Sequence, residues 1–410
     1  MSSVIDNRRQ QLRQYALITA NYWVFTLTDG ALRMLVVLYF HQLGYAPLDL
    51  ALLFAFYEAF GVVTNLIGGW LGARFGLNKT MNLGLFLQIV ALSLLLVPSD
   101  YLTVLWVMTA QALSGIAKDL NKMSAKSSIK LLVPSDENTR LFKWVALLTG
   151  SKNTLKGVGF FLGGLLLASV GFRGAITLMA SLLLLVWLFS LIKLKQDIGR
   201  SRYKPKFTEI FSKSNSVNYL SAARMFLFSS RDVWFVIALP VFLASKLGWS
   251  HTFVGGFLAT WVIVYGFVQA GAPAIVKRTN RSKLSGRTAF IWALLLAIIP
   301  AVIAVSLHFN WSLSPTIIGG LLIFGAIFAI NSALHSYLII EYASEDKVSL
   351  DVGFYYMANA MGRLIGTLLS GLIFQLYGLL PCLIISTLFI VIAGVLSLGI
   401  DSTDSRRNLI

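Results

Sequence analysis

Long apolar stretches recur along the chain from Tyr15 almost to its end, and each contains about twenty residues. At 1.5 Å per residue, a helix of that length crosses a hydrocarbon core about 30 Å thick. Membrane-spanning strands alternate polar and apolar residues, and these stretches do not. Inside a bilayer the backbone must satisfy its own hydrogen bonds, which a helix does within one segment. The chain is therefore predicted to be an all-α membrane protein.

The composition supports this class, because 57% of the 410 residues are hydrophobic and only 12% are charged. A typical soluble domain has about 25% charged residues. The single cysteine, Cys382, excludes an internal disulfide and a cysteine metal cluster. The P-loop pattern of ATP-hydrolysing proteins is not present. We therefore expect neither a metal nor a cofactor.

Twelve apolar blocks can be delimited along the sequence. They cover residues 15–41, 48–74, 80–98, 102–127, 141–168, 172–194, 218–246, 251–276, 287–308, 313–341, 351–377 and 379–400. The longest polar connection, 196–217, separates them into two sets of six. We predict twelve transmembrane helices in two pseudo-symmetric halves, over 1–195 and 218–410, with 196–217 as a cytoplasmic linker. Such a layout is typical of secondary transporters.

Basic residues are distributed unevenly among the connections. The chain has 34 Lys and Arg against 17 Asp and Glu, a formal net charge of +17. Most of these cations lie in the termini and in the connections on the N-terminal side, whereas only Arg173 and Lys246, at the ends of two predicted spans, fall on the opposite side. The positive-inside rule then predicts that both termini are cytoplasmic. Because the basic segments are short loops between helices, we do not expect nucleic-acid binding.

The connection after the second block reads "GGWLGARFGLNKT" and is similar to a loop motif of the major facilitator superfamily, G-x-x-x-[DE]-[RK]-x-G-x-[RK]-[RK]. Gly69, Arg74, Gly76 and Lys79 fit the motif, which in that family belongs to a gating loop. Ala73 stands where the family has an acid, and Asn78 replaces a basic residue, so the charge relay of the loop is incomplete. The resemblance implies the major facilitator fold.

A closer resemblance extends over nearly the whole chain. The stretches "NYWVFTLTDGALRMLVVLYFH", "FYEAFGVVTNLIGGWLGARFGLNKTMN", "SGIAKDLNKMSAKSSIKLLVP" and "WVALLTGSKNTLKGVGFFLGG" resemble the ArsJ branch of that superfamily, the organoarsenical efflux permeases. The resemblance implies export of 1-arseno-3-phosphoglycerate from a bacterial cytoplasmic membrane. It also implies a functional link to glyceraldehyde-3-phosphate dehydrogenase, which makes this ester when it accepts arsenate instead of phosphate. We expect the permease to be a monomer.

Some charged residues lie deep within the predicted spans, away from the loops, and the cations among them are the candidate substrate-binding residues. Eight of them are basic: Arg33, Lys118, Lys122, Lys152, Lys156, Arg224, Arg231 and Arg363. Four are acidic: Asp29, Glu58, Asp119 and Asp232. A charge at the centre of a membrane helix costs about 2.5–3.5 kcal/mol on insertion scales, so these side chains should line an aqueous cavity or pair with one another.

The spacing of these residues favours a shared site. Asp29 and Arg33 lie four residues apart, as do Lys118 and Lys122, and Lys152 and Lys156, so each couple shares one face of its helix. Like charges at this spacing repel, which a sequence selected only for stability would avoid.

Structural explanations remain open for most of these charges. Arg33 could pair with Asp29, Lys118 with Asp119, and Arg231 with Asp232. Lys118 and Lys122 could also extend toward the membrane surface. Lys126 and Lys130 continue the four-residue ladder beyond one span's length from Leu102, so we expect topology alone to explain them.

A cavity with surplus cations selects a ligand with at least two negative charges, because guanidinium and ammonium groups form charge-assisted hydrogen bonds with phosphate-like oxygens. Pentavalent arsenic is a hard oxyanion, whereas trivalent arsenic demands thiolates. One cysteine therefore disfavours arsenite as the cargo. A native phosphorylated metabolite, such as a sugar phosphate or phosphoglycerate, remains the alternative substrate.

The expected mechanism is alternating access between the two halves. Asp29 and Glu58 are the candidates for proton coupling, since a buried carboxylate can exchange a proton near neutral pH. Their alternative role is to neutralise Arg33 and nearby cations. A membrane-embedded enzyme is not expected, because the sequence has no H-E-x-x-H motif and no serine-triad pattern, so we assign no catalytic residue.

Overall fold

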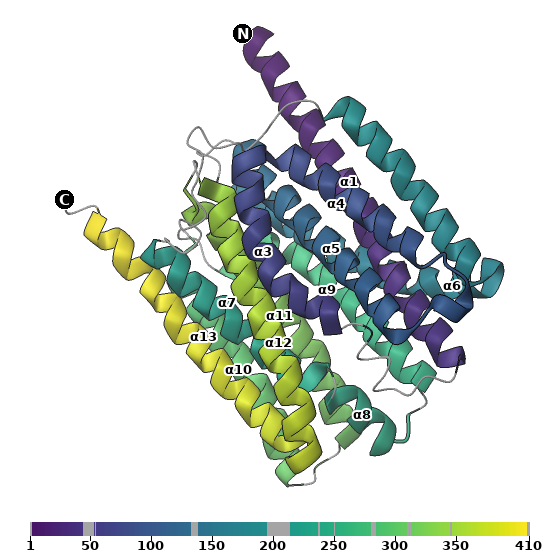
Figure 1. The fold of residues 1–410 in the computed structure, drawn as a ribbon. Helices are drawn as coiled ribbons and strands as arrows, with labels where there is room; N and C mark the ends of the chain where they lie inside the picture. Colours follow the sequence, from purple (N-terminus) through teal and green to yellow (C-terminus); the bar gives the residue numbers. More distant parts are fainter. Residues whose placement is uncertain are drawn as a thin grey trace. The chain divides into compact units, whose positions relative to one another are not determined.

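The computed structural model describes residues 2–43, 53, 55–132, 138–194, 214–236, 238–249, 251–279, 284–309, 311, 313–344 and 347–407. Helices account for almost all of these residues, and no strand occurs among them (Figure 1). The chain divides into two compact units. Unit 1 comprises residues 1–144, 151–211 and 343–357, and unit 2 comprises 145–150, 212–342 and 358–410. The predicted all-α architecture is confirmed.

Unit 1 is organised around a polar helix, α5. Its elements are α1 (Ser2–Gln42), α3 (Ala55–Phe75), α4 (Leu77–Leu94), the 3-10 turn η1 (Ser99–Tyr101), α5 (Val104–Leu132) and most of α6 (Asn138–Lys193). α5 packs against α1, α3 and α4. The first turns of α12 (Val348–Tyr377) also belong to this unit. The charged residues of α5 are therefore surrounded by other helices.

Unit 2 contains the remaining helices. They are α7 (Asn215–Phe235), α8 (Ala238–Ser245), α9 (His251–Thr279), α10 (Gly286–His308), α11 (Leu313–Tyr342), the rest of α12, and α13 (Leu379–Arg407). α13 packs along α7 and α10, and α11 packs against α9 and α10. This arrangement encloses an apolar core between α7, α10, α11 and α13.

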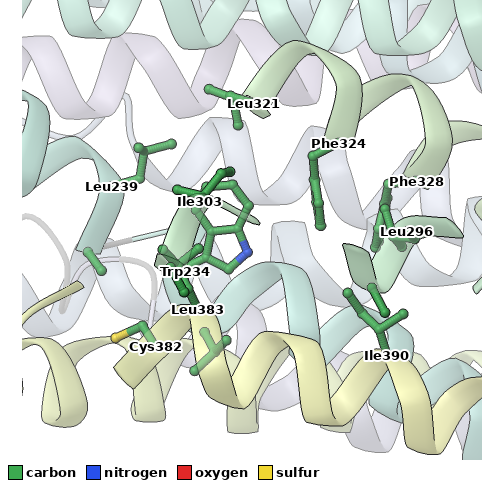
Figure 2. Packing of buried hydrophobic residues seen from close by; sticks show 14 of the residues in the cluster. Trp234, Leu239, Leu296, Ile303, Leu321, Phe324, Phe328, Cys382, Leu383 and Ile390 are labelled. Atoms are coloured by element: carbon green, nitrogen blue, oxygen red, sulfur yellow. The ribbon is translucent and has the colours of Figure 1, made fainter. Parts of the chain in front are cut away.

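Buried aromatic and aliphatic side chains fill that core (Figure 2). Trp234 of α7 is 1% exposed, and its ring meets Phe324 of α11 edge to face at a centroid distance of 5.1 Å. Leu383 and Cys382 of α13 are fully buried on the same core. Burial of apolar surface at about 25 cal/mol per Å² makes this cluster a main source of stability within unit 2.

The helix boundaries match most of the predicted spans. The fifth and sixth spans form one helix by hydrogen bonding, but Gly171, in the predicted gap between them, has φ 70° and ψ 178°. Only glycine adopts that conformation readily, so the chain turns there. Within the seventh span, α7 ends at Phe235 and α8 begins at Ala238. Pro240, in the first turn of α8, lacks the backbone N–H that would bond to the Val236 carbonyl oxygen.

Nine stretches within the described residues are long and apolar enough to cross a membrane. One of them, Leu141–Lys193, is long enough for two crossings of about 20 residues each. α3 and α5 are not among the nine, and in α5 Lys118, Asp119 and Lys122 lower the hydropathy. The count of twelve spans stays a prediction. Residues 196–213 of the predicted linker lie outside the described residues.

α1 and α6 approach closely within unit 1 because glycines line their contact. A Cβ atom on Gly30 would lie 2.7 Å from the carbonyl oxygen of Lys156, and one on Gly159 would lie 3.0 Å from the nitrogen of Ala31. Gly163 in the next turn faces the Ala31 carbonyl oxygen in the same way. Small residues permit such backbone contact between membrane helices. The contact sets the lysines of α6 beside α1.

Candidate functional site

Tyr57 of α3 connects three of the charged residues in unit 1. Its hydroxyl donates hydrogen bonds to Asp29 of α1, at 2.8 Å to Oδ1 and 3.1 Å to Oδ2. The Arg33 guanidinium carbon lies 4.7 Å from the centroid of the tyrosine ring, and Lys118 Nζ lies 3.7 Å from it. Cation–π attraction holds both cations on this ring. Arg33 and Lys118, from different helices, thus share one buried aromatic partner.

Asp119 of α5 lies between two lysines of the ladder. Lys122 Nζ donates a hydrogen bond to Asp119 Oδ1, and Lys118 Nζ is 4.0 Å from Oδ2. The Asp119 side chain is 1% exposed, and those of Lys118 and Lys122 are 17% and 14% exposed. The predicted alternative that Lys118 pairs with Asp119 is therefore confirmed as a contact. Both lysine side chains are thus mostly buried inside unit 1 and do not extend fully out of it.

Lys126 differs from the sequence-based expectation. Topology was expected to explain this residue, but its side chain is 5% exposed and donates a hydrogen bond to the Tyr356 hydroxyl of α12. Lys122 Nζ also lies 4.8 Å from the centroid of the Tyr356 ring. The tertiary contact is made between residues 230 positions apart, which explains why sequence spacing could not reveal it. The Lys130 side chain lies outside the described residues.

These contacts define a unit 1 basic cluster. It consists of Asp29, Arg33, Tyr57, Lys118, Asp119, Lys122, Lys126 and Tyr356. Tyr22 of α1 lies close to Asp29 and Asp119 and is 2% exposed. Its hydroxyl has no hydrogen-bond partner among the described residues. A buried polar atom without a partner is costly, and the cluster contains such an atom on Tyr22.

Lys152 and Lys156 occupy successive turns of α6 and are half-buried. Lys156 Nζ lies 5.7 Å from the Phe160 ring centroid. Nearby, Trp23 Nε1 of α1 donates a 2.8 Å hydrogen bond to Ser151 Oγ of α6. The α1–α6 contact therefore brings these two predicted lysines to the helix that carries Asp29 and Arg33.

Arg224 of α7 anchors the basic residues of unit 2. Its Nε donates a 2.8 Å hydrogen bond to Asn359 Oδ1 of α12, and its Nη1 donates a 3.2 Å bond to the carbonyl oxygen of Ser332 in α11. The guanidinium carbon lies 4.0 Å from the Phe228 ring centroid. Arg224 is 3% exposed, so its charge is held by these contacts inside the unit.

Asp232 of α7 joins the other two predicted arginines. Arg231 Nε donates a 2.6 Å hydrogen bond to Asp232 Oδ1, and Arg363 Nε of α12 lies 3.5 Å from Oδ2. The predicted alternative pairing of Arg231 with Asp232 is therefore confirmed as a contact. We call Arg224, Arg231, Asp232, Asn359 and Arg363 the unit 2 basic cluster.

The residues of the gating-loop motif lie at the junction between α3 and α4. Gly76 separates the two helices with φ 98° and ψ 151°, a conformation that favours glycine. A Cβ atom on Gly69 would contact the Ser349 carbonyl oxygen of α12, and the Ser349 hydroxyl donates a 2.9 Å bond to the Gly69 carbonyl. Arg74 lies over the Trp70 ring at 5.1 Å, and Lys79 is exposed. Gly69 thus permits a close helix contact, and Gly76 permits the backbone conformation of the junction.

Glu58 belongs to α3, but its side chain lies outside the described residues. Asp29 is 6% exposed and accepts the bonds from Tyr57 described above. Sequence reasoning missed Tyr57, Tyr356 and Asn359, which contact the predicted cations. Aromatic residues are common in membrane helices, so their identity alone carried no signal. Among the described residues, no group of three or more His, Cys, Asp or Glu side chains is arranged to hold a metal ion.

The fold is shared with several solved transporter structures. The E. coli fucose:proton symporter superimposes with a TM-score of 0.73 at 14% identity, covering 95% of this chain and 98% of the symporter. The human organic anion transporter MFSD10 gives 0.73 at 16% identity, covering 94% and 99%. A bacterial homologue of the iron transporter ferroportin gives 0.73 at 14% identity, covering 95% and 99%. At these identities the likeness concerns the fold.

A sequence comparison with curated proteins gave no match. The family model of the Major Facilitator Superfamily matches residues 18–334 and 220–409, which together include most of the sequence. The predicted superfamily is thereby confirmed, and so is the expectation of a multi-pass membrane transporter. The chain belongs to the Major Facilitator Superfamily.

Proposed function

We propose that this transporter exports an anionic organoarsenical, 1-arseno-3-phosphoglycerate, and thereby confers resistance to arsenate. The substrate follows from the resemblance of "SGIAKDLNKMSAKSSIKLLVP" and the related stretches to the ArsJ permeases. We further propose that the chain lies in a bacterial cytoplasmic membrane as a monomer with both termini cytoplasmic, as the positive-inside rule predicts. Its functional partner is glyceraldehyde-3-phosphate dehydrogenase, which supplies the ester.

The surplus of cations in both basic clusters is the observation that supports an anionic substrate best. The unit 1 cluster contains Arg33 and three lysines against two aspartates. The unit 2 cluster contains three arginines against Asp232. Arginine forks and lysine ammonium groups favour phosphate-like oxyanions. We propose that these cations, together with Lys152 and Lys156, bind the substrate.

The chemistry of arsenic supports an ester of arsenate over free arsenite. Arsenite requires thiolates, and the single cysteine, Cys382, is fully buried in the apolar core of unit 2. Arsenate esters present hard oxygens, which hydrogen-bond donors on arginine and lysine accommodate. A solved structure with the same fold is named an organic anion transporter, so the fold accommodates an anionic cargo.

We propose that transport proceeds by alternating access. The loop motif with Gly69, Arg74, Gly76 and Lys79 would act in gating, since the Gly69–Ser349 contact tolerates no side chain at position 69. Asp29 and Glu58 are the proposed proton-coupling carboxylates. The alternative role of Asp29, neutralising the cations near Tyr57, is supported by its place in the unit 1 basic cluster.

A native phosphorylated metabolite is the second candidate substrate, because the same cations would bind a sugar phosphate or a phosphoglycerate. Transport assays with everted vesicles separate the two candidates. If ordinary 3-phosphoglycerate is transported as fast as the arsenic ester and competes with it equally, the native metabolite is favoured.

The proposal is tested by arsenate tolerance in an arsenic-sensitive bacterial host. We expect growth in arsenate when the transporter is expressed together with glyceraldehyde-3-phosphate dehydrogenase, and no protection when the host lacks that activity. Protection that does not depend on the dehydrogenase would contradict ester export. An Arg231→Gln variant with wild-type expression serves as a control for transport, and we expect it to lose protection.

A further inference from the structure

Each unit holds one buried carboxylate between two basic side chains. In unit 1, Asp119 accepts a hydrogen bond from Lys122 and lies 4.0 Å from Lys118 Nζ. In unit 2, Asp232 accepts a 2.6 Å hydrogen bond from Arg231 and lies 3.5 Å from Arg363 Nε. Both aspartates have side chains that are 1% exposed. The same arrangement, two cations on one buried acid, thus occurs in both units.

The second oxygen of each carboxylate distinguishes these groups from fully satisfied ion pairs. Oδ2 of Asp119 and Oδ2 of Asp232 are buried, and neither has a hydrogen-bond partner among the described residues. Buried ion pairs that only stabilise a fold use additional hydrogen bonds to satisfy the remaining lone pairs. In each carboxylate, Oδ1 accepts a hydrogen bond from one cation, and the second cation approaches Oδ2 without forming a hydrogen bond.

A glycine of a neighbouring helix lies against each aspartate. A Cβ atom on Gly61 of α3 would lie 3.0 Å from Asp119 Oδ2, and one on Gly366 of α12 would lie 2.9 Å from the Asp232 Cβ atom. A larger residue at either position would crowd the aspartate. Glycine at these two positions thus allows the neighbouring helices to pack closely against both acids.

We infer that Asp119 and Asp232 are resident counter-anions, which compete with the transported anion for the cations of their clusters. This inference rests on the proposed function, in which those cations bind an anionic substrate. A carboxylate engages ammonium and guanidinium donors as one edge of a phosphate or arsenate group does. In the empty protein each aspartate neutralises one of two cations, and a bound oxyanion must take over that contact.

The competition has a consequence for affinity. One acid and two cations give each group of three a formal charge of +1. The group therefore attracts an anion, but more weakly than two cations without the acid would. A transporter must release its cargo after each crossing. Binding energy that is equal in the ground state and in the transition state of transport does not raise the turnover rate. The aspartates therefore set the substrate affinity, although they do not contact the substrate as ligands.

The inference predicts tighter binding when a counter-anion is removed. We propose isothermal titration calorimetry of the purified full-length protein in detergent, with 3-phosphoglycerate as the probe. Asp119→Asn and Asp232→Asn should each lower Kd at least threefold relative to the wild type, because asparagine cannot neutralise the cations. Asp100→Asn makes the same charge change at an exposed position in η1, and its Kd should remain within twofold of the wild type.

A double-mutant cycle keeps the inference testable if a single aspartate variant unfolds. Lys122→Gln should weaken binding at least tenfold, since Asp119 then neutralises Lys118 alone. Adding Asp119→Asn to Lys122→Gln should restore at least a threefold part of that loss. A merely structural ion pair would restore the unfolding midpoint of the Lys122→Gln variant without changing its Kd.

The outcomes separate the inference from the proposed function. If the wild type binds 3-phosphoglycerate and neither aspartate variant nor the double variant binds more tightly than its parent, the counter-anion role is overturned. If only the aspartate variants bind measurably, the role is supported in its strongest form. If no variant binds the probe at all, the anionic substrate of the proposed function is contradicted, and the counter-anion role falls with it.

Discussion

The Tyr57 hydroxyl of α3 donates a 2.8 Å hydrogen bond to Asp29 Oδ1 of α1. Two cations, Arg33 and Lys118, lie on the ring of the same tyrosine. Asp29 is thus connected to the lysine ladder of α5 through an aromatic side chain instead of a direct ion pair with Lys118. Tyr57 positions the unit 1 basic cluster by two separable interactions, one through its hydroxyl and one through its ring.

Replacing Tyr57 by Phe should remove the hydroxyl interaction and retain the ring. A buried acceptor that loses its donor costs about 1–3 kcal/mol, so we expect a lower unfolding midpoint in detergent and reduced transport. Tyr57→Leu should reduce transport further, because Arg33 and Lys118 then lose their aromatic partner. Tyr101→Phe is the matched control, since Tyr101 is 67% exposed. Equal behaviour of Tyr57→Phe and Tyr101→Phe would disprove the role of the hydroxyl.

Replacing Lys118 or Lys122 by Ala should impair transport into everted vesicles. Each change removes one cation from the pair around Asp119 and leaves a less cationic cluster for the substrate. We expect kcat/KM to fall at least tenfold, equivalent to about 1.4 kcal/mol of transition-state stabilisation. Lys143→Ala, at an exposed position of α6, should leave transport near the wild-type value. Similar small losses in all three variants would indicate a topological role for the lysines.

The proton-coupling candidates can be tested by the pH dependence of transport. Asp29→Asn should abolish a dependence on the pH gradient in vesicles, because the amide cannot carry a proton. Glu58→Gln provides the second variant for the same measurement. An unchanged pH dependence in both variants would remove Asp29 and Glu58 as candidates and leave the neutralising role for Asp29.

The core of unit 2 predicts a large cost for truncation at Leu383. This side chain is 0% exposed on α13 and packs in the cluster that includes Trp234. Leu383→Ala should destabilise the protein by about 2–5 kcal/mol through lost contacts and a cavity. Leu398→Ala on the same helix is the control, because Leu398 is 40% exposed. Thermal unfolding in detergent measures both, and similar midpoints would argue against the core packing in Figure 2.

The contact between α1 and α6 predicts sensitivity at Gly159. A methyl group there would meet the backbone of Leu27, Gly30 and Ala31, so α1 and α6 would have to separate. We expect Gly159→Ala to cost about 1–3 kcal/mol by overpacking. Gly256→Ala in α9 places its methyl group where no atom lies within 4 Å and should cost little. A wild-type unfolding midpoint for Gly159→Ala would contradict the close contact.

Most of the helix pattern could be predicted from sequence, because hydrophobic length and chain-breaking residues act locally. Gly171 and Gly378 lie in the predicted gaps between spans and have positive φ values of 70° and 79°. The break between α7 and α8, shortly before Pro240, was concealed by the apolar residues on both sides. Hydropathy alone reported one continuous span where the structure has two helices, α7 and α8.

The candidate site could be predicted only in part. The charged residues were visible because a membrane helix excludes charges that have no role. Their aromatic partners were not, since Tyr57 and Tyr356 come from α3 and α12 and reach α5 only after folding. Lys126 shows the limit of counting residues from one end of a span. It is buried by a contact with Tyr356 that no local pattern encodes.

Accumulation of arsenic in everted membrane vesicles tests the central claim most directly. The ester is generated continuously outside the vesicles by glyceraldehyde-3-phosphate dehydrogenase from glyceraldehyde 3-phosphate, NAD and arsenate. We predict arsenic uptake that requires the dehydrogenase, is inhibited by excess 3-phosphoglycerate, and falls at least tenfold in Lys122→Ala or Arg231→Gln. Equal arsenic uptake from arsenate alone, or wild-type uptake in both variants, would contradict export of an anionic arsenic ester by the two basic clusters.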